Sequence, residues 1–308
     1  MAQISAEIDY VIPRSDVTYS FDSGTPPVLE IEPGAIVLFE TQDCFGGQIE
    51  TEADLVTAID MAYANPATGP VAIRGAEPGD SLIAEILQIH PGSRGFTTIF
   101  PGIGQLASDC AGPMTKLLPI EHGMVYFSDR VRFPVRPMMG VLGVAPDAGP
   151  VATLHPGQHG GNLDERFHRA GTTIYFPVRH AGALFAAGDM HASMGDGEIC
   201  GTGVEVAGEV IIRFDLLKNK MARFPVSETR ESWIAHGVAE QYAGALRVAC
   251  QEAAALLTRE WNLSMDEAFM LLSVRGDAGV CQSCQPCAVA STARMVVPKF
   301  AAIPGPFA

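Results

Sequence analysis

The sequence predicts a β-rich α+β fold, a sandwich or barrel of strands with two helices in the C-terminal region. Up to about residue 225 the chain consists of short apolar runs separated by turn signals, and helical periodicity begins only after Pro225. Hydrophobic residues make up 47% of the chain and charged residues 18%, with 32 glycines and 22 prolines. Such a composition is typical of a compact, turn-rich globular protein.

Strands are expected throughout the first two thirds of the chain. VLEIEPGAIVLFET (28–41) and PVAIRGAEPGDSLIAEILQIHPG (70–92) each predict two strands around a Glu-Pro-Gly turn, in which proline presets φ and glycine takes the left-handed position. TTIYFPV (172–178), ALFAAGDMH (183–191) and GVEVAGEVIIRFDLL (203–217) predict further strands, the last with a bulge at Gly208.

The helices follow later. Apolar residues recur at steps of three and four from Val238 to Leu256, which predicts an amphipathic helix. Ser264 and Glu267 form a capping-box pattern for a second helix ending near Leu272, and ARMVVPKF (293–300) predicts a last strand. Because no low-complexity linker interrupts the chain, we expect a single unit over 1–308; the alternative is a β-rich part at 1–225 and a helix-containing part at 226–308.

Composition and charge exclude several classes of protein. The net charge of −15 and the absence of clustered Lys and Arg argue against nucleic-acid binding. No apolar run approaches the roughly 18 to 20 residues that cross a bilayer, so no membrane association is expected. The first residues do not read as a secretory signal, and the seven cysteines are therefore expected as reduced thiols in the cytoplasm.

The segment GDMHASMGDGEICGTGVEV (188–206) gathers four polar groups among glycines. Asp189 and His191 have period-two spacing and on a strand would share one face, while the Gly-Asp-Gly turn at Asp196 would bring Glu198 back toward them. Carboxylate oxygen and imidazole nitrogen suit Zn²⁺ or a similar divalent ion. The alternative is a polar hairpin in which Asp196 serves its own turn and Glu198 is solvated.

A second loop of this kind lies one strand unit earlier in the chain. LHPGQHGGNLDERFH (154–168) contains His159, Asn162 and Asp164 beside a Gly-Gly pair that permits close backbone approach. If the two loops converge, their ligands can hold a metal ion while a free carboxylate acts on its water. A polar loop with scattered histidines is the alternative.

Two cysteine-containing segments also carry candidate chemistry. Asp43 and Cys44 precede a Gly-Gly turn; Asp43 is a candidate site residue, and Cys44 is a candidate nucleophile only if the fold brings a histidine to it. The spacing of Cys281, Cys284 and Cys287 matches ladders that bind iron–sulfur clusters or zinc. No Cys or His follows to complete that set, and a redox-sensitive loop is the alternative.

Six segments, taken in order, resemble the acetamidase/formamidase family over about residues 10–300. They are NPATGPVAIRGAEPGDSL, FPGIGQL, RPMMGVLGVAP, PGQHGGNLD, GALFAAGDMHASMGDGEICGTGVEV and MLLSVRGD. The resemblance implies a jelly-roll-like β-sandwich or barrel and hydrolysis of short amides such as formamide and acetamide, in some members lactams. It also implies a divalent metal, generally zinc with calcium in some members, and a homodimer or a larger homo-oligomer.

The resemblance also carries over individual polar positions. These are Asp43, Gln48, Asn162, Asp164, Asp189, His191, Asp196 and Glu198. We expect Asp164 and His191 to bind the metal, with Asp189 or His159 completing the set. Glu198 is the expected proton carrier between water and the departing amine, and Asn162 is expected to stabilise the oxyanion. Asp43 and Asp196 are further catalytic candidates, and the cysteine ladder departs from the family pattern.

A rival hypothesis treats the chain as a binding protein without catalysis. In it, the Asp-rich loops hold Ca²⁺ only to stabilise a β-sandwich, because calcium takes six to eight oxygen ligands. His191 discriminates between the two hypotheses, since imidazole suits zinc and is a poor ligand for calcium.

Overall fold

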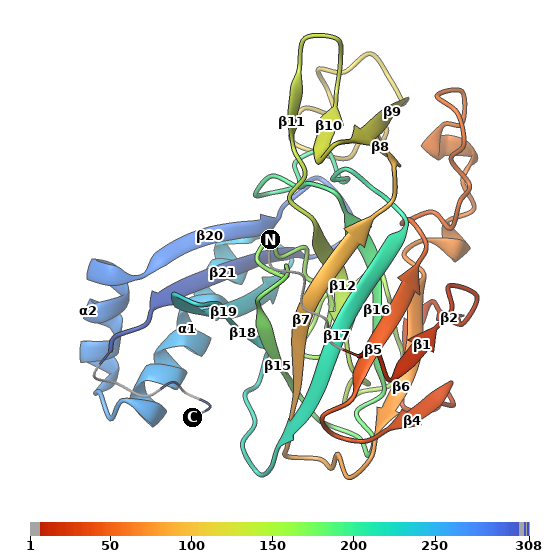
Figure 1. The fold of residues 1–308 in the computed structure, drawn as a ribbon. Coiled ribbons are helices and arrows are strands. Elements are labelled where there is room, and N and C mark those ends of the chain that lie inside the picture. The colour runs from red at the N-terminus through yellow and green to blue at the C-terminus, as the bar shows by residue number, and fades with distance from the viewer. Residues whose placement is uncertain (1–6, 302–304, 306, 308) are drawn as a thin grey trace.

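Strands dominate the computed structural model, which describes residues 7–301, 305 and 307 (Figure 1). The β-rich α+β class is therefore confirmed. The two α-helices of the described chain both fall after Pro225, with α1 at Tyr242–Glu260 and α2 at Met265–Arg275. Short 3₁₀ turns occur at η1 (Val56–Ala58) and η2 (Met61–Tyr63).

The largest sheet has nine strands and runs through both halves of the sequence. In spatial order its strands are β1 (Tyr10–Ile12), β5 (Ile36–Thr41), β17 (Gly208–Leu217), β7 (Ser81–Pro91), β15 (Thr173–Pro177), β18 (Val226–Glu228), β19 (Ser232–Ala239), β21 (Ser291–Pro298) and β20 (Asp277–Gln282). Strands from beyond Pro225 therefore extend a sheet begun by the first residues of the described chain.

A second sheet of six strands packs against one end of the first. It contains β14 (Gly160–Asn162), β12 (Met138–Gly143), β16 (Phe185–His191), β6 (Ala67–Ile73) and β2 (Val17–Thr18), with β4 (Leu29–Ile31) paired to β6. Phe185 of β16 lies 5.9 Å from Phe39 of β5 and 4.9 Å from Phe214 of β17, measured between ring centroids. These three buried rings join the two sheets in one core.

Two smaller sheets complete the fold. One contains β11 (Arg132–Pro134), β10 (Met124–Tyr126), β9 (Met114–Glu121) and β8 (Arg94–Ile99), and the other pairs β13 (Val151–Ala152) with β3 (Ser20–Phe21). Figure 1 shows the four-stranded sheet projecting from the sandwich. None of the described helices is long and apolar enough to cross a membrane.

The helix α1 covers the outer part of the nine-stranded sheet at very short range. A Cβ atom on Gly237 of β19 would lie 2.2 Å from the carbonyl oxygen of Ala245 and 2.3 Å from the amide nitrogen of Ala249. Because small side chains face each other here, the helix backbone can contact the strand directly. Helix α1 is in this way attached to the part of the nine-stranded sheet that follows Pro225.

Several sequence expectations need correction. Val238 starts no helix, because β19 continues to Ala239 in register with β21; α1 begins four residues later, at Tyr242. The second helix has the expected capping box but extends to Arg275. β17 begins at Gly208, and its irregularity against β7 lies between Ile211 and Ile212. The four-stranded sheet and β18 to β20 were not predicted.

Candidate active site

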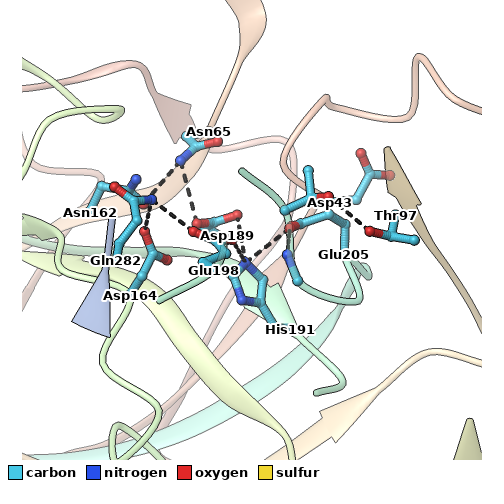
Figure 2. Close-up of polar contacts among 12 residues, drawn as sticks. Asp43, Asn65, Thr97, Asn162, Asp164, Asp189, His191, Glu198, Glu205 and Gln282 are labelled. Atoms are coloured by element: carbon cyan, nitrogen blue, oxygen red, sulfur yellow. Dashed lines mark hydrogen bonds and ion pairs between the residues drawn. The ribbon is translucent and has the colours of Figure 1, made fainter. Parts of the chain in front are cut away.

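The candidate site is built around His191, the last residue of β16. Its side chain is almost completely buried, and Figure 2 shows carboxylates converging on its Nε2 atom. This atom lies 3.2 Å from Glu205 Oε1, 3.5 Å from Asp189 Oδ1 and 3.8 Å from Glu198 Oε1. Glu198 lies in the loop after β16 and Glu205 just before β17, so one excursion of the chain supplies both glutamates.

A fourth carboxylate, Asp164, follows β14 and is held by an amide side chain from the far end of the sequence. Gln282, the last residue of β20, donates from Nε2 to Asp164 Oδ2 at 2.6 Å and to Glu198 Oε2 at 2.8 Å. Asn65 makes a comparable bridge on the other side, donating to Asn162 Oδ1 at 3.2 Å and to Asp189 Oδ2 at 3.4 Å. The two loops expected to converge do so, and these amides connect them.

Three of the carboxylates stand on strained backbone. Asp164, Asp189 and Glu198 have φ values of +47°, +54° and +42°, in the left-handed region. This conformation costs a non-glycine residue roughly 1–2 kcal/mol and persists only where surrounding contacts enforce it. In this conformation Asp189 and Glu198 lie within 4 Å of His191 Nε2.

Glycines make room for this cluster. A Cβ atom on Gly140 of β12 would lie 2.4 Å from Asp189 Oδ2 and 2.5 Å from Asp164 Oδ1. A Cβ atom on Gly203 would lie 2.7 Å from His191 Nδ1. The glycine content of these segments therefore has a direct steric reason, because backbone approaches the polar groups where no side chain fits.

The buried charges of the site do not balance one another. Burial raises the pKa of Asp164 well above its ordinary value, and Glu198 and Asp189 raise it further. Burial also raises the pKa of Glu198, and it raises that of Glu205 to about 7. For His191, burial lowers the pKa, but Glu205 and Asp189 prevail and hold it well above its usual value. Four carboxylates thus face one imidazole in a desolvated space, an arrangement that a bound cation would stabilise.

The donor atoms also fit a metal ion. Asp164, His191 and Glu198 each offer a ligand atom, all within 4.8 Å of one another, and Cys44, Asp189 and Glu205 form a second such group. Among the described residues, Asp164 Oδ1, Glu205 Oε2 and the two ring nitrogens of His191 have no hydrogen-bond partner. Buried polar atoms are normally paired, so the two oxygens and the unprotonated ring nitrogen of a neutral His191 are available to a cation.

A cavity of about 290 Å³ opens onto the cluster. Asn162, Asp164, Asp189, Glu198, Glu205 and Gln282 line its polar end. The rest of its lining includes Phe45, Met61, Phe100, Ile103, Leu154 and Val289. A small molecule can therefore reach the carboxylates along an apolar wall.

Three predicted site residues lie apart from this cluster. His159 packs its ring against Phe21, with 5.0 Å between centroids, and burial lowers its pKa to about 4. Asp196 is paired with Arg166 at 3.0 Å and with Arg294 at 2.6 Å. Asp43 accepts hydrogen bonds from the amides of its own turn, at Phe45 and Gly47. None of the three lines the cavity.

Sequence reasoning missed Asn65, Glu205 and Gln282. Glu205 carried little signal, because a carboxylate between Val204 and Val206 fits the ordinary alternation of a strand, in which the polar residue faces solvent. Asn65 and Gln282 carried none, since an isolated amide residue is common on any surface. Their role emerges only when distant segments meet.

The cysteine ladder is divided between two environments. Cys281 is buried, does not line the cavity and donates to Glu165 Oε2 at 3.2 Å. Cys284 and Cys287 line the cavity with their sulfur atoms 3.1 Å apart. None of the three belongs to either potential metal-binding group found among the described residues.

Several known proteins share the fold of this chain. The crystal structure of an acetamidase from Bacillus halodurans superimposes with a TM-score of 0.90 at 41% identity, covering 94% of this chain and 97% of the other. That of a predicted acetamidase/formamidase from the thermophile Thermoanaerobacter tengcongensis gives a TM-score of 0.90 at 35% identity, over 94% and 95%. An acetamidase from Mycolicibacterium smegmatis is 26% identical over 269 residues; the match spans 66% of each chain, slightly under two thirds of that enzyme.

The sequence profile of one family accounts for most of the chain. It matches residues 16–152 and 148–280, a range that contains the six-stranded sheet, the His191 cluster and most of the nine-stranded sheet. The resemblance inferred from the six sequence segments is thereby confirmed, and the chain belongs to the Acetamidase/Formamidase family.

Proposed function

We propose that this protein is a metal-dependent amidohydrolase that cleaves the C–N bond of a small uncharged amide to give a carboxylate and ammonia. Formamide and acetamide, after which its relatives are named, are the simplest such substrates. The observation that carries the proposal is the excess of buried carboxylate around His191 at the polar end of a cavity.

Asp164, His191 and Glu198 would hold the metal, which we propose to be Zn²⁺. Imidazole nitrogen is a good ligand for zinc and a poor one for calcium, although the many carboxylates make Ca²⁺ the alternative. A divalent ion there would supply Lewis acidity and a water molecule that ionises near neutral pH. Gln282 would orient the two carboxylate ligands through its hydrogen bonds.

We assign the proton transfer to Glu205 rather than to Glu198. Glu198 forms a potential metal-binding group with Asp164 and His191, and Gln282 donates to its Oε2 atom, so its carboxylate would be held as a ligand. Glu205 also lines the cavity, and its Oε2 atom has no hydrogen-bond partner among the described residues. An acid–base group must collect a proton from water and deliver it to the departing amine, since the amine leaves only when protonated.

Asn162 is the proposed donor to the carbonyl oxygen of the substrate. Its Oδ1 atom is engaged by Asn65, which fixes the carboxamide and leaves its Nδ2 group as the remaining donor. A preoriented donor in a desolvated site stabilises the negative charge that develops on the oxygen.

A thiol mechanism through Cys44 is not favoured. Burial, together with Glu205 and Asp189, raises the pKa of the Cys44 thiol well above its ordinary value. A neutral thiol is a weak nucleophile, because the thiolate is the reactive form.

The test is ammonia release before and after the metal is removed. The purified protein is assayed with acetamide and larger neutral amides, stripped with a chelator, and assayed again after addition of Zn²⁺ or Ca²⁺. We expect activity to disappear on stripping and to return with Zn²⁺. Undiminished hydrolysis by the stripped protein contradicts the metal mechanism, and a metal-loaded protein that releases no ammonia supports the rival binding function.

A further inference from the structure

We infer that the substrate is a neutral amide with a bulky apolar acyl group, of the size of a phenyl ring, rather than formamide or acetamide. This inference rests on the proposed amide hydrolysis and concerns the part of the substrate that does not react. It follows from the size of the cavity, the arrangement of its lining and its charge.

The cavity is too large for the smallest amides. It measures about 290 Å³, close to the lower limit of roughly 300 Å³ for pockets that enclose drug-sized ligands. Formamide has three non-hydrogen atoms and acetamide four, and each occupies a volume comparable to only a few water molecules of about 30 Å³. Either would leave most of the space filled with water against apolar side chains.

The lining combines the carboxylates and amides of the site with a set of apolar side chains, and it also includes His155, Thr202, Cys284 and Cys287. The carboxylates and amides that would act on the C–N bond are buried, whereas Met61 at the cavity is 44% exposed and marks its opening. Phe100, Ile103, Leu154 and Val289 are half-buried and supply the wall between. A substrate with its amide group at His191 would therefore lay its acyl group along apolar side chains.

One side of this wall is aromatic. Phe45 stacks on Phe96 with 5.7 Å between centroids and meets Phe100 edge-on at 6.1 Å, so both cavity-lining rings are held in place. A fixed pair of rings favours a flat apolar group, because aromatic contacts add to the free energy of burial.

The lining offers no basic side chain to an anionic acyl group. No Lys or Arg is among the residues that line the cavity, and four carboxylates lie at its end. An amide with a carboxylate on its acyl group would find no Lys or Arg along the wall to pair with that carboxylate. The acyl group is therefore uncharged as well as apolar.

The test compares kcat/KM for formamide, acetamide, benzamide and phenylacetamide, with succinamate as the anionic control. We expect phenylacetamide or benzamide to exceed acetamide at least tenfold, since each methylene-sized group in an apolar pocket changes specificity by roughly 10-fold or more. Succinamate should be the poorest substrate. A preference for formamide or acetamide overturns the inference and leaves the amidase proposal intact; if no amide at all is hydrolysed, the amidase proposal fails and the inference with it.

Substitutions that reduce the volume of the cavity test the inferred size of the substrate in the protein itself. Ile103→Trp places a large side chain in the cavity, and Leu106→Trp is the matched control, because Leu106 lies in the same loop but is 60% exposed and does not line the cavity. We expect Ile103→Trp to lower the ratio of kcat/KM for phenylacetamide to that for acetamide at least tenfold, and Leu106→Trp to leave the ratio unchanged. Val289→Trp fills another part of the wall and serves if Ile103→Trp does not fold. An unchanged ratio in a folded cavity-filling variant contradicts the inference.

Discussion

At the residue scale, the site depends on backbone that approaches carboxylates more closely than a side chain would allow. Asp164 and Asp189 hold left-handed conformations, and Gly140 leaves the space in which their oxygens meet. The energetic cost is local strain and desolvated charge, which other contacts must offset. Such a site is sensitive to single atoms.

Gly140→Ala tests this sensitivity. The new methyl group would lie 2.4 to 2.5 Å from oxygens of Asp189 and Asp164, so at least one carboxylate must move. We expect amidase activity and metal content both to fall at least tenfold, because a displacement near 1 Å disrupts a reacting geometry. Gly195→Ala is the control, since nothing lies within 4 Å of a Cβ atom there. If Gly140→Ala had the activity of the wild type, the space left by this glycine would not be needed for the site.

His159 gives a prediction on pH dependence. Burial lowers its folded-state pKa to about 4, against an ordinary value of 6.5, so the unfolded chain binds the proton first as the pH falls. The free energy of unfolding therefore falls between pH 6.5 and pH 4, by roughly 1.4 kcal/mol per pH unit for this group. His159→Phe should retain the packing on Phe21 and lose up to roughly 3 kcal/mol of that pH dependence in urea titrations at pH 7 and pH 4. An identical pH dependence in the variant and the wild type would contradict the neutral, buried state of His159.

At the element scale, strands and loops from four parts of the chain supply the site, and a buried ion pair fixes three of them behind it. Arg294 of β21 contacts Glu165 Oε1 at 3.5 Å, Asp196 Oδ2 at 2.6 Å and the carbonyl oxygen of Val280 at 2.9 Å. Glu165 adjoins Asp164, and Asp196 lies two residues before Glu198. The arginine thus holds together the loop after β14, the loop after β16 and strand β20.

Arg294→Met tests this role. The substitution leaves the buried Glu165 with His236 at 3.4 Å and Cys281 at 3.2 Å as its remaining partners. Breaking a buried pair typically costs about 3–5 kcal/mol, and these partners place the expected loss at the lower end, about 3 kcal/mol. Chemical denaturation should show a loss of this order. Arg213→Met is the control: Arg213 pairs with Glu85 at 3.1 Å but is 50% exposed, and it should cost about 1 kcal/mol or less. Equal losses of unfolding free energy in the two variants would show that the buried Arg294 pair stabilises the protein no more than an exposed pair does.

Some of the helices and strands could be predicted from the sequence and others could not. The Glu-Pro-Gly turns, β15, β16 and the capping box of α2 were predictable, because each depends on neighbours in sequence. The start of α1 was not, since Val238 and Ala239 continue the apolar pattern yet pair with β21. The sequence of the two loops identified four candidate site residues, His191, Asp164, Asp189 and Glu198. Gln282 could not be identified in this way, because its contact with Glu198 joins segments more than 80 residues apart in sequence.

At the scale of the whole molecule, the nine-stranded sheet joins the β-rich and helix-containing parts. β15 from before Pro225 pairs with β18 from after it, and Gln282 extends from the later part into the site. We therefore keep the single unit over 1–308 as a prediction. The expected homo-oligomer and the cytoplasmic location also stay predictions.

The two tryptophans allow a test of the single unit. Trp233 and Trp261 both lie after Pro225, so fluorescence follows the later part, while far-UV circular dichroism follows strands of both parts. Thermal or urea unfolding should give coincident transitions by the two methods, as expected for one cooperative unit. Two separate transitions would favour the division at residue 225.

Whether the His191 cluster is a metal centre can be measured as the metal content of the protein purified without added metal. We expect about one zinc ion or more per chain in the wild type and in His90→Ala, an exposed control. In His191→Ala we expect less than about a tenth of that metal content, with circular dichroism unchanged. A folded His191→Ala variant that keeps the full metal content, or a wild-type protein that hydrolyses amides with no metal bound, would contradict the assignment of a metal centre.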